Sequence, residues 1–326
     1  MGDVPAPMSP PPPLSKEEEA RRVLVTADLD GIVRYISEKN PKNVIVMVGA
    51  GLSTAAGIPD FRSPGTGLYA NLKRFNLPSP EDIFDIEYFR DHPEAFYELA
   101  RDLWPTGKKY SPTISHFFVK LLEQQGRLLR CYTQNVDTLE LLTGMNPRRV
   151  VAAHGNFATA HALNGKQVPI HELEDAIMAG PEACRALAGK YGALVKPDIV
   201  FFGEPLPKRF TYGVAADFPN CDLLIVLGTS LTVAPFNQLV AKVPPRCPRI
   251  LINREMAGTH PHILGGFRFG DADRRDVFLK GDIDLAIRNF CQRVGWLKAL
   301  EAMHAEGSMD AAVERAAEGF RLRARL

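Results

Sequence analysis

Two glycines separated by one residue, Gly49 and Gly51, follow directly after the apolar run Asn43–Val48. Glycine at these positions permits a tight turn and a close approach of a ligand to the backbone. The small residues Ser53–Ala56 come next, as expected where a helix begins and its free N–H groups attract phosphate. The pattern predicts a strand, a glycine loop and a helix start that together bind a pyrophosphate. A glycine turn without a ligand is the alternative, because a lone Gly-x-Gly is a weak signal.

The segment after this loop carries residues suited to a nucleotide. Asp60, Phe61 and Arg62 follow the glycines closely, and an arginine there can pair with phosphate while a phenylalanine covers a ring. A hydride-transferring dehydrogenase shares the strand, glycine loop and helix. It normally carries an acidic residue at the end of its second strand, about twenty residues on. Here that stretch is the loop beyond Arg62, and no separate substrate domain follows, so we disfavour that class.

Four further apolar runs, over residues 128–132, 149–153, 222–227 and 249–252, also end in small, amide or charged residues. In open α/β sheets, ligands bind outside the carboxyl ends of the strands. We therefore expect one cleft formed by five strand ends. The residues that follow these four runs are Thr133–Asp137, His154–Gly155, Gly228–Ser230 and Asn253–Glu255.

Composition is that of a compact enzyme. The chain has 326 residues, 45% of them hydrophobic, and a formal net charge of +1, which disfavours a basic nucleic-acid-binding surface. No apolar run has membrane-spanning length, and we expect no membrane partner. The five cysteines are scattered, and Cys131 and Cys221 lie in or beside apolar strands, as buried thiols of intracellular proteins do.

Prolines and helix-capping residues indicate the organisation of the chain. Residues 1–14 contain a proline run and form an arm, and the capping box at Ser15–Glu18 predicts a helix across the late teens and twenties. Ser79 and Ser111 each precede a proline and are predicted N-caps. Strands alternate with helices as far as a closing helix over 284–294. This order predicts a doubly wound, Rossmann-like parallel sheet.

Seven short segments, in this order, resemble the sirtuins, which are NAD-dependent protein deacylases. Their features are the glycine loop, the arginine loop, an amide cluster, a histidine, a phenylalanine-rich strand and two strand ends. The resemblance covers roughly residues 40–295 and is most similar to the class I branch, which contains the main deacetylases. The segments are Gly49–Ser53, Gly57–Arg62, Thr133–Asp137, His154–Gly155, Lys196–Glu204, Gly228–Ser230 and Ile252–Arg254.

The resemblance implies an NAD-dependent protein lysine deacetylase that transfers the acetyl group to ADP-ribose and releases nicotinamide. His154 would be the base for a ribose hydroxyl, and Asn135 would position the nicotinamide ribose; both are the implied catalytic residues. Substrate-binding residues implied by position are Phe157, Val200, Phe201, Gly203 and Glu204. Cofactor-binding residues implied by position are Gly49, Ala50, Gly51, Leu52, Ser53, Thr54, Asp60, Phe61, Arg62, Gln134, Asn135, Val136, Asp137, His154, Gly228, Thr229, Ser230, Asn253, Arg254, Glu255 and Asp282.

The same resemblance divides the chain into a catalytic domain over residues 15–295, with a small inserted module at about 159–194, and a helical extension over 296–326. Sirtuins usually build this module on two Cys-x-x-Cys pairs that hold structural zinc. The corresponding positions carry no cysteine, so we expect no zinc and a small helical module held by its apolar core. These positions are Ala162, Gly165, Ala188 and Tyr191.

Other potential zinc ligands lie nearby. His161, His171 and Cys184 lack both the paired spacing and a fourth ligand, so we expect no metal site there. Two segments of the module, Ile170–Met178 and Glu182–Ala188, have helical patterns.

Alternatives stay open for individual residues and for the function. His154 can be a strand-end histidine bonded to backbone, Asp137 can cap the helix that follows, and Phe201 can be a core residue. A catalytically weak NAD- or ADP-ribose-binding module and a mono-ADP-ribosyltransferase are the alternative functions. The expected partners are acetylated lysine proteins or peptides, without nucleic acid. The expected location is the cytoplasm or nucleus, with the mitochondrion left open.

Overall fold

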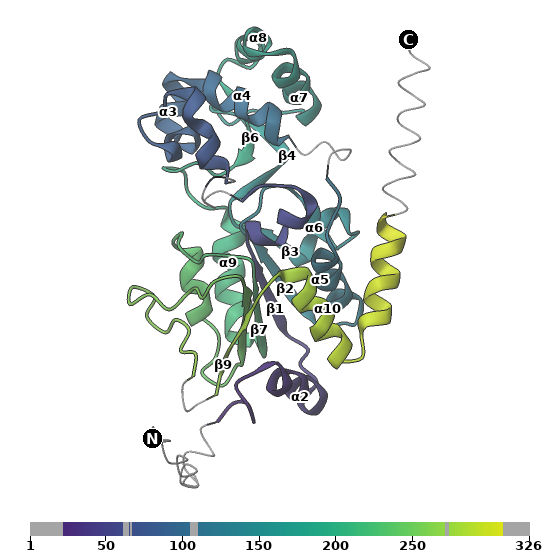
Figure 1. Cartoon of the computed structure of the whole chain (residues 1–326). Helices are drawn as coiled ribbons and strands as arrows, with labels where there is room; N and C mark the ends of the chain where they lie inside the picture. The colour runs from purple at the N-terminus through teal and green to yellow at the C-terminus, as the bar shows by residue number, and fades with distance from the viewer. Residues whose placement is uncertain (1–21, 61–64, 66, 105–109, 271–273, 309–326) are drawn as a thin grey trace, which may run out of the picture.

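The computed structural model describes residues 22–60, 65, 67–104, 110–270 and 274–308 (Figure 1). The arm over 1–14, the helix start at 15, Phe61 and Arg62 lie outside the described residues. No helix among the described residues is long and apolar enough to cross a membrane.

A six-stranded sheet forms the centre of the larger part of the molecule, in the order β3-β2-β1-β7-β8-β9. All five neighbouring pairs are parallel, which confirms the predicted doubly wound sheet. Every residue of β1 and β7 is buried, as in strands covered on both faces. The strands are β1 (Val44–Val48), β2 (Leu128–Thr133), β3 (Val150–Ala152), β7 (Leu223–Leu227), β8 (Arg249–Asn253) and β9 (Asp276–Lys280).

The strand order reverses between β1 and β7. These two strands pair in register from Val44 and Leu223 to Val48 and Leu227, so the loops that follow them begin side by side. Such a reversal creates a crevice at the carboxyl ends of the strands, where ligands bind in sheets of this kind.

Helices cover both faces of the sheet (Figure 1). One core cluster joins the sheet to α2 (Leu29–Lys39), α5 (Ile114–Gln124) and α10 (Ile283–Arg293), and Leu300 from a helix over 297–308 is fully buried against it. The opposite face packs against α9 (Lys208–Asp217) and the short helices η6 (Phe218–Asn220) and η7 (Phe236–Ala241).

Helix starts differ in part from the predictions. The helix expected across the twenties is wrong for residues 22–28, which are irregular; α2 begins later, because the Asp28 side chain accepts the Gly31 N–H at 2.9 Å. Ser79 is an N-cap as predicted, but the helix it begins is the short η4 (Pro80–Phe84). The predicted cap Ser111 is wrong: Thr113 caps α5, and its N–H donates to His116 Nδ1 at 3.1 Å.

A smaller module lies beyond the carboxyl edge of the sheet. The two predicted helices are α7 (Ile170–Ala179) and α8 (Pro181–Tyr191), and an antiparallel sheet in the order β5-β4-β6 accompanies them. Buried residues between Leu68 and Trp104 complete the module's core. The remaining elements here are β4 (Gly155–Ala162), β5 (Gln167–Val168), β6 (Val195–Ile199), η3 (Leu68–Phe75), α3 (Ile86–Asp91) and α4 (Pro93–Leu103).

Candidate functional site

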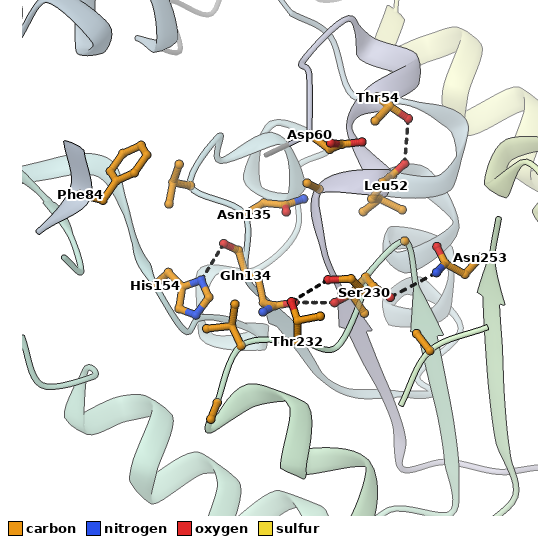
Figure 2. Close-up of a pocket in the computed structure, with 18 of the residues that line it drawn as sticks. Leu52, Thr54, Asp60, Phe84, Gln134, Asn135, His154, Ser230, Thr232 and Asn253 are labelled. Carbon is orange, nitrogen blue, oxygen red and sulfur yellow. Dashed lines mark hydrogen bonds between the residues drawn. The ribbon is translucent and has the colours of Figure 1, made fainter. Parts of the chain in front are cut away.

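A cavity of about 720 Å³ lies at the carboxyl ends of β1, β2, β3, β7 and β8, between the parallel sheet and the small module (Figure 2). The structure therefore brings all five predicted strand ends to one place. Predicted site residues that line the cavity are Ala50, Gly51, Leu52, Thr54, Asp60, Gln134, Asn135, Val136, His154, Val200, Phe201, Gly203, Glu204, Gly228, Thr229, Ser230, Asn253, Arg254, Glu255 and Asp282.

The glycine loop after β1 packs tightly against the loop after β7. The Gly51 N–H donates to the Gly228 carbonyl at 2.9 Å, and a Cβ on Gly51 would lie 2.8 Å from Gly228 Cα. Gly228 has a φ of +59°, and a Cβ there would lie 2.6 Å from the Leu52 nitrogen. Close contact between the two loops requires these glycines, whether or not a ligand is present.

The helix predicted after the glycines is wrong. Two short 3₁₀ turns follow instead, η1 (Ala50–Leu52) and η2 (Thr54–Ala56), and Gly57 ends the second with a φ of +89°. The loop therefore has no long helix behind it, and the N–H groups of Leu52 and Ser53 donate to the Gly49 and Ala50 carbonyls at 3.0 Å.

Ser53 and Asp137 lie behind the cavity wall and contact each other. The Ser53 hydroxyl donates to Asp137 Oδ2 at 2.6 Å, and Asp137 Oδ1 accepts the Leu139 N–H at 3.0 Å, at the start of α6 (Leu139–Leu142). Burial raises the pKa of Asp137, while the bonds from Ser53 and Leu139 oppose that rise. The alternative of Asp137 as a helix cap thus has a geometric basis.

Asn135 connects this buried pair to the glycine loop. Its Nδ2 donates to the Gly49 carbonyl at 3.1 Å and to Ser53 Oγ at 3.3 Å. Asn135 is only 4% exposed, yet it lines the cavity. His116 Nε2 lies 3.5 Å from Ser53 Oγ on the other side, and burial lowers the pKa of this histidine to about 3. His116 is fully buried, as expected for a packed helix residue.

Hydrogen bonds also join the ends of β2, β7 and β8. The Thr229 hydroxyl donates to Gln134 Oε1 at 2.7 Å, and Asn253 Nδ2 donates to the Thr229 carbonyl at 3.3 Å (Figure 2). Gln134, Thr229 and Asn253 therefore form a continuous polar surface along the cavity.

His154 is oriented by the carbonyl of Gln134. The imidazole Nδ1 lies 3.2 Å from this oxygen, which can only accept, so Nδ1 carries the proton and Nε2 is a free base (Figure 2). Burial lowers the pKa of His154, and the bond to Gln134 offsets part of that shift. The imidazole of His154 therefore stays neutral at pH values below 6.5, the ordinary pKa of histidine.

The segment after β6 forms the wall nearest the small module. The Val200 N–H donates to the His154 carbonyl at 2.8 Å, and the backbone of Phe202 bonds to that of Phe84 and Ile86. Phe201 is 1% exposed and packs edge-to-face against Phe84, so it is a core residue that also lines the cavity.

Phe157 lies apart from the other predicted residues. It is 4% exposed, and its ring centroid lies 5.0 Å from that of Trp104 in the core of the module. Several cavity residues were not predicted. Thr232–Pro235 follow Gly228–Ser230 after one residue, and Met256 follows Glu255 directly, so both could have been found by extending those strand ends. Phe84, at the end of η4, and His260 show no motif.

Comparison with known proteins identifies the family. The profile of the Sir2 family matches residues 49–235. NAD-dependent protein deacetylase sirtuin-2 of Danio rerio is 47% identical over 296 residues, which are 86% of this chain and 76% of that protein. The chain belongs to the Sir2 family.

Other Sir2 relatives match over a similar extent. NAD-dependent protein deacetylase hst2 of Schizosaccharomyces pombe is 43% identical over 296 residues, covering 90% of this chain and 83% of that protein. NAD-dependent protein deacetylase sirtuin-3 of Mus musculus is 41% identical over 274 residues, covering 83% and 78%. The resemblance to sirtuins drawn from seven short segments is thereby confirmed.

The module of this Sir2 chain joins a hairpin to a helix end by hydrogen bonds. Asn164 Nδ2 and Lys166 Nζ donate to the Tyr191 carbonyl at the end of α8, at 3.0 and 3.2 Å. The Tyr191 hydroxyl donates to Glu172 on α7 at 3.0 Å. In the part of the chain that the structure describes, no group of three or more His, Cys, Asp or Glu side chains is placed to hold a metal ion.

Proposed function

We propose that this protein is an NAD-dependent protein lysine deacetylase, which transfers the acetyl group to ADP-ribose and releases nicotinamide. The observation that carries the proposal is His154, a neutral base with a free Nε2 that lines the cavity together with Asn135 and Gln134. The deacetylase relatives, 41–47% identical over most of the chain, support the same function.

We infer that NAD lies across the crevice between β1 and β7. When bound, NAD supplies the ribose carbon that the acetyl-lysine oxygen attacks and the nicotinamide that leaves. The backbone at Ala50 and Thr54, which line the cavity, suits the pyrophosphate, whereas the N–H groups of Gly51 and Leu52 already donate to the Gly228 and Gly49 carbonyls. Arg62 would join this backbone from outside the described residues. Thr229, Ser230, Asn253 and Arg254 would bind the adenosine half, with Glu255 and Asp282 beside them at the same end of the cavity.

The other end of the cavity suits the nicotinamide ribose. Asn135 is fixed by two hydrogen bonds and would hold this ribose in a reactive orientation. His154 would accept a ribose hydroxyl proton at Nε2, because its imidazole stays neutral at physiological pH. Asp137, whose carboxylate is already bonded to Ser53 and Leu139, would act by fixing the loop around Asn135.

The substrate peptide would pair with the segment after β6. Among the described residues, the backbone N–H and carbonyl of Gly203 have no hydrogen-bond partner, whereas those of Phe202 are used by Phe84 and Ile86. A free backbone edge beside a cavity suits β-strand addition of an extended peptide. The apolar side chains of Val200 and Phe201 at this wall suit the stem of an acetylated lysine.

We also propose that the module needs no zinc. The side chains at Ala162, Gly165, Ala188 and Tyr191 supply no thiolate or imidazole, and structural zinc needs about four such donors. His161 contacts Asp198 at 2.8 Å. The bonds from Asn164 and Lys166 to Tyr191, together with a core that includes Leu173, Ile177 and Leu187, would hold the hairpin on α8.

The cysteines agree with the expected cytoplasmic or nuclear location. All five are buried free thiols, as is usual in reducing compartments. The near-zero net charge supports the expectation that protein, not nucleic acid, is the partner.

The decisive experiment incubates the purified protein with an acetyl-lysine peptide, with and without NAD. We expect free nicotinamide and deacetylated peptide in equal amounts, and neither product without NAD. Nicotinamide with the peptide still acetylated would favour ADP-ribosyl transfer. Thermal stabilisation by NAD without either product would favour the alternative of a binding module.

A further inference from the structure

A buried lysine, Lys196 on β6, lies beneath the segment proposed to bind peptide. It is 7% exposed, and its Nζ donates to the Ile199 carbonyl at 2.6 Å. The same ammonium lies 2.9 Å from Glu204 Oε2 and 4.5 Å from the centre of the Phe201 ring. The carbonyl of Pro197 is a more distant acceptor at 3.4 Å. One positive charge thus contacts both ends of the turn over residues 199–204.

Glu204 completes this arrangement. The Oε2 atom that faces Lys196 also accepts the Phe201 N–H at 2.8 Å. A single carboxylate oxygen therefore connects the ammonium to the backbone in the middle of the turn. The turn is closed by these charge-assisted bonds together with the Glu204 N–H, which donates to the Phe201 carbonyl at 3.0 Å.

Lys196 acts from behind the turn. Val200 and Phe201 line the large cavity and Lys196 lines a second cavity of about 370 Å³, whereas Gly203 and Glu204 line both. Gly203 and Glu204 thus separate the two cavities, and Lys196 contacts Glu204 from the side of the second cavity.

We propose that Lys196 is a positioning residue for the substrate peptide, and this inference rests on the proposed deacetylase function. Glu204 is half-buried, with a quarter of its side chain exposed, and a half-buried carboxylate without its cation is less favourable, because the lost attraction no longer offsets the cost of partly removing the charge from water. Without Lys196, Glu204 would turn toward the large cavity, which it already lines, and would release the Phe201 N–H. The free edge at Gly203 would then lose its fixed orientation.

The test compares Lys196→Met with Lys196→Arg and a matched control, Lys190→Met. Lys190 also pairs with a glutamate, Glu172, at 2.6 Å. The Lys190 side chain, however, is 58% exposed and lies near the C-terminal end of α8. We expect Lys196→Met to raise the KM for acetylated peptide by roughly tenfold or more, as losing a charged hydrogen bond does. The KM for NAD should stay within about twofold, since the NAD end of the cavity is untouched. Lys196→Arg, which keeps the charge, should recover most of the loss, and Lys190→Met should match the wild type.

A purely structural role makes a different prediction. It lowers the melting temperature of Lys196→Met but leaves the peptide KM of the folded protein unchanged, and that result would overturn the proposal. If Lys196→Met does not fold, Glu204→Gln and the double variant Lys196→Met/Glu204→Gln replace it. The double variant removes both charges of the pair, and we expect it to fold with a raised peptide KM; a wild-type peptide KM in it would also overturn the proposal.

Binding of a fluorescent acetyl-lysine peptide, measured by anisotropy without turnover, separates this inference from the proposed function. A wild-type protein that neither binds the peptide nor releases nicotinamide defeats the proposed function. Active wild-type protein with unchanged peptide binding in all variants defeats only the role of Lys196.

Discussion

The Ser53 hydroxyl donates to Asp137 Oδ2 at 2.6 Å and so ties the loop after β1 to the turn after β2. Both side chains are buried, and burial already raises the pKa of Asp137. Ser53→Ala removes a bond that favours the carboxylate, so Asp137 should protonate at a higher pH in the variant. We expect the KM for NAD to rise in Ser53→Ala, and to rise more at pH 6 than at pH 8.

Steady-state kinetics at the two pH values measure this effect. Ser37→Ala is the control, because Ser37 is exposed on α2 and its hydroxyl donates to the Val33 carbonyl within its own helix at 3.0 Å. Equal rises in KM at both pH values would disprove the coupling to the Asp137 carboxyl.

His154→Ala should abolish deacetylation while NAD still stabilises the protein against heating. The reason is that a base contributes to the chemical step and little to ground-state binding. His161→Ala is the matched control, since this histidine is half-exposed on β4 and pairs with Asp198. In the wild type, the lowered pKa of His154 should place the acid limb of the kcat/KM profile below pH 6.5. Undiminished deacetylation by His154→Ala would remove it from the mechanism.

Asn135→Ala should lose both nicotinamide release and deacetylation. The amide is held by the Gly49 carbonyl and by Ser53, so its loss also frees the glycine loop from the turn after β2. Misplaced reacting groups commonly cost about a hundredfold in rate. Nicotinamide release is measured directly, with Asn220→Ala, an exposed asparagine on η6, as the control. Normal release would show that Asn135 has no part in the site.

Chelator should leave the melting temperature and activity unchanged, and metal analysis should give well under one zinc per chain. The four positions expected to bear zinc ligands are Ala, Gly, Ala and Tyr, and the loss of all four removes a site that the loss of one would only weaken. A stoichiometric zinc would show that His161, His171 and Cys184 form a site after all.

Acid should destabilise the protein through His116. This imidazole is fully buried with a pKa of about 3, so below its ordinary pKa of 6.5 the unfolded chain binds a proton that the folded chain excludes. Stability from this group is therefore present above pH 6.5 and lost as the pH falls. Between pH 7.5 and pH 5 the loss should be about 2 kcal/mol.

Urea unfolding at the two pH values tests the effect, with His116→Gln as the variant. Glutamine keeps an acceptor for the Thr113 N–H but does not titrate, so the wild type should lose about 2 kcal/mol more than the variant on acidification. The exposed His171→Gln should behave like the wild type. A parallel pH dependence in wild type and His116→Gln would contradict the prediction.

Most of the central sheet could be predicted because its strands are continuously apolar. β9 was missed for a physical reason: it begins with Asp276, a charge that sequence reasoning assigns to the surface. In the structure Asp276 pairs with Arg249 at 2.5 Å, and both are almost fully buried. Whether two charges far apart in sequence neutralise each other is decided by tertiary packing, which a local pattern does not contain.

The site could be predicted to the level of strand ends but not of side-chain direction. Ser53 and Asp137 lie in the expected segments yet point toward each other behind the cavity, and Phe157 points into the module's core. Gly51 was expected to make room for phosphate and Gly228 to bind the cofactor, but the two glycines also make room for each other. Facing elements that the local sequence does not specify determine these orientations.

The small module is joined to the sheet at a place where it also holds the proposed base. The His154 carbonyl accepts the Val200 N–H at 2.8 Å, and a Cβ on Gly155 would lie 1.7 Å from the Asp198 carbonyl. The start of β4 and the end of β6 therefore contact each other through backbone atoms, with no side chain between them. Because His154 Nδ1 also bonds to the Gln134 carbonyl on the sheet side, the proposed base lies where the two layers are joined. A side chain at position 155 would force the two layers apart at this point, and the proposed base and the peptide-binding segment would then lose their common anchor.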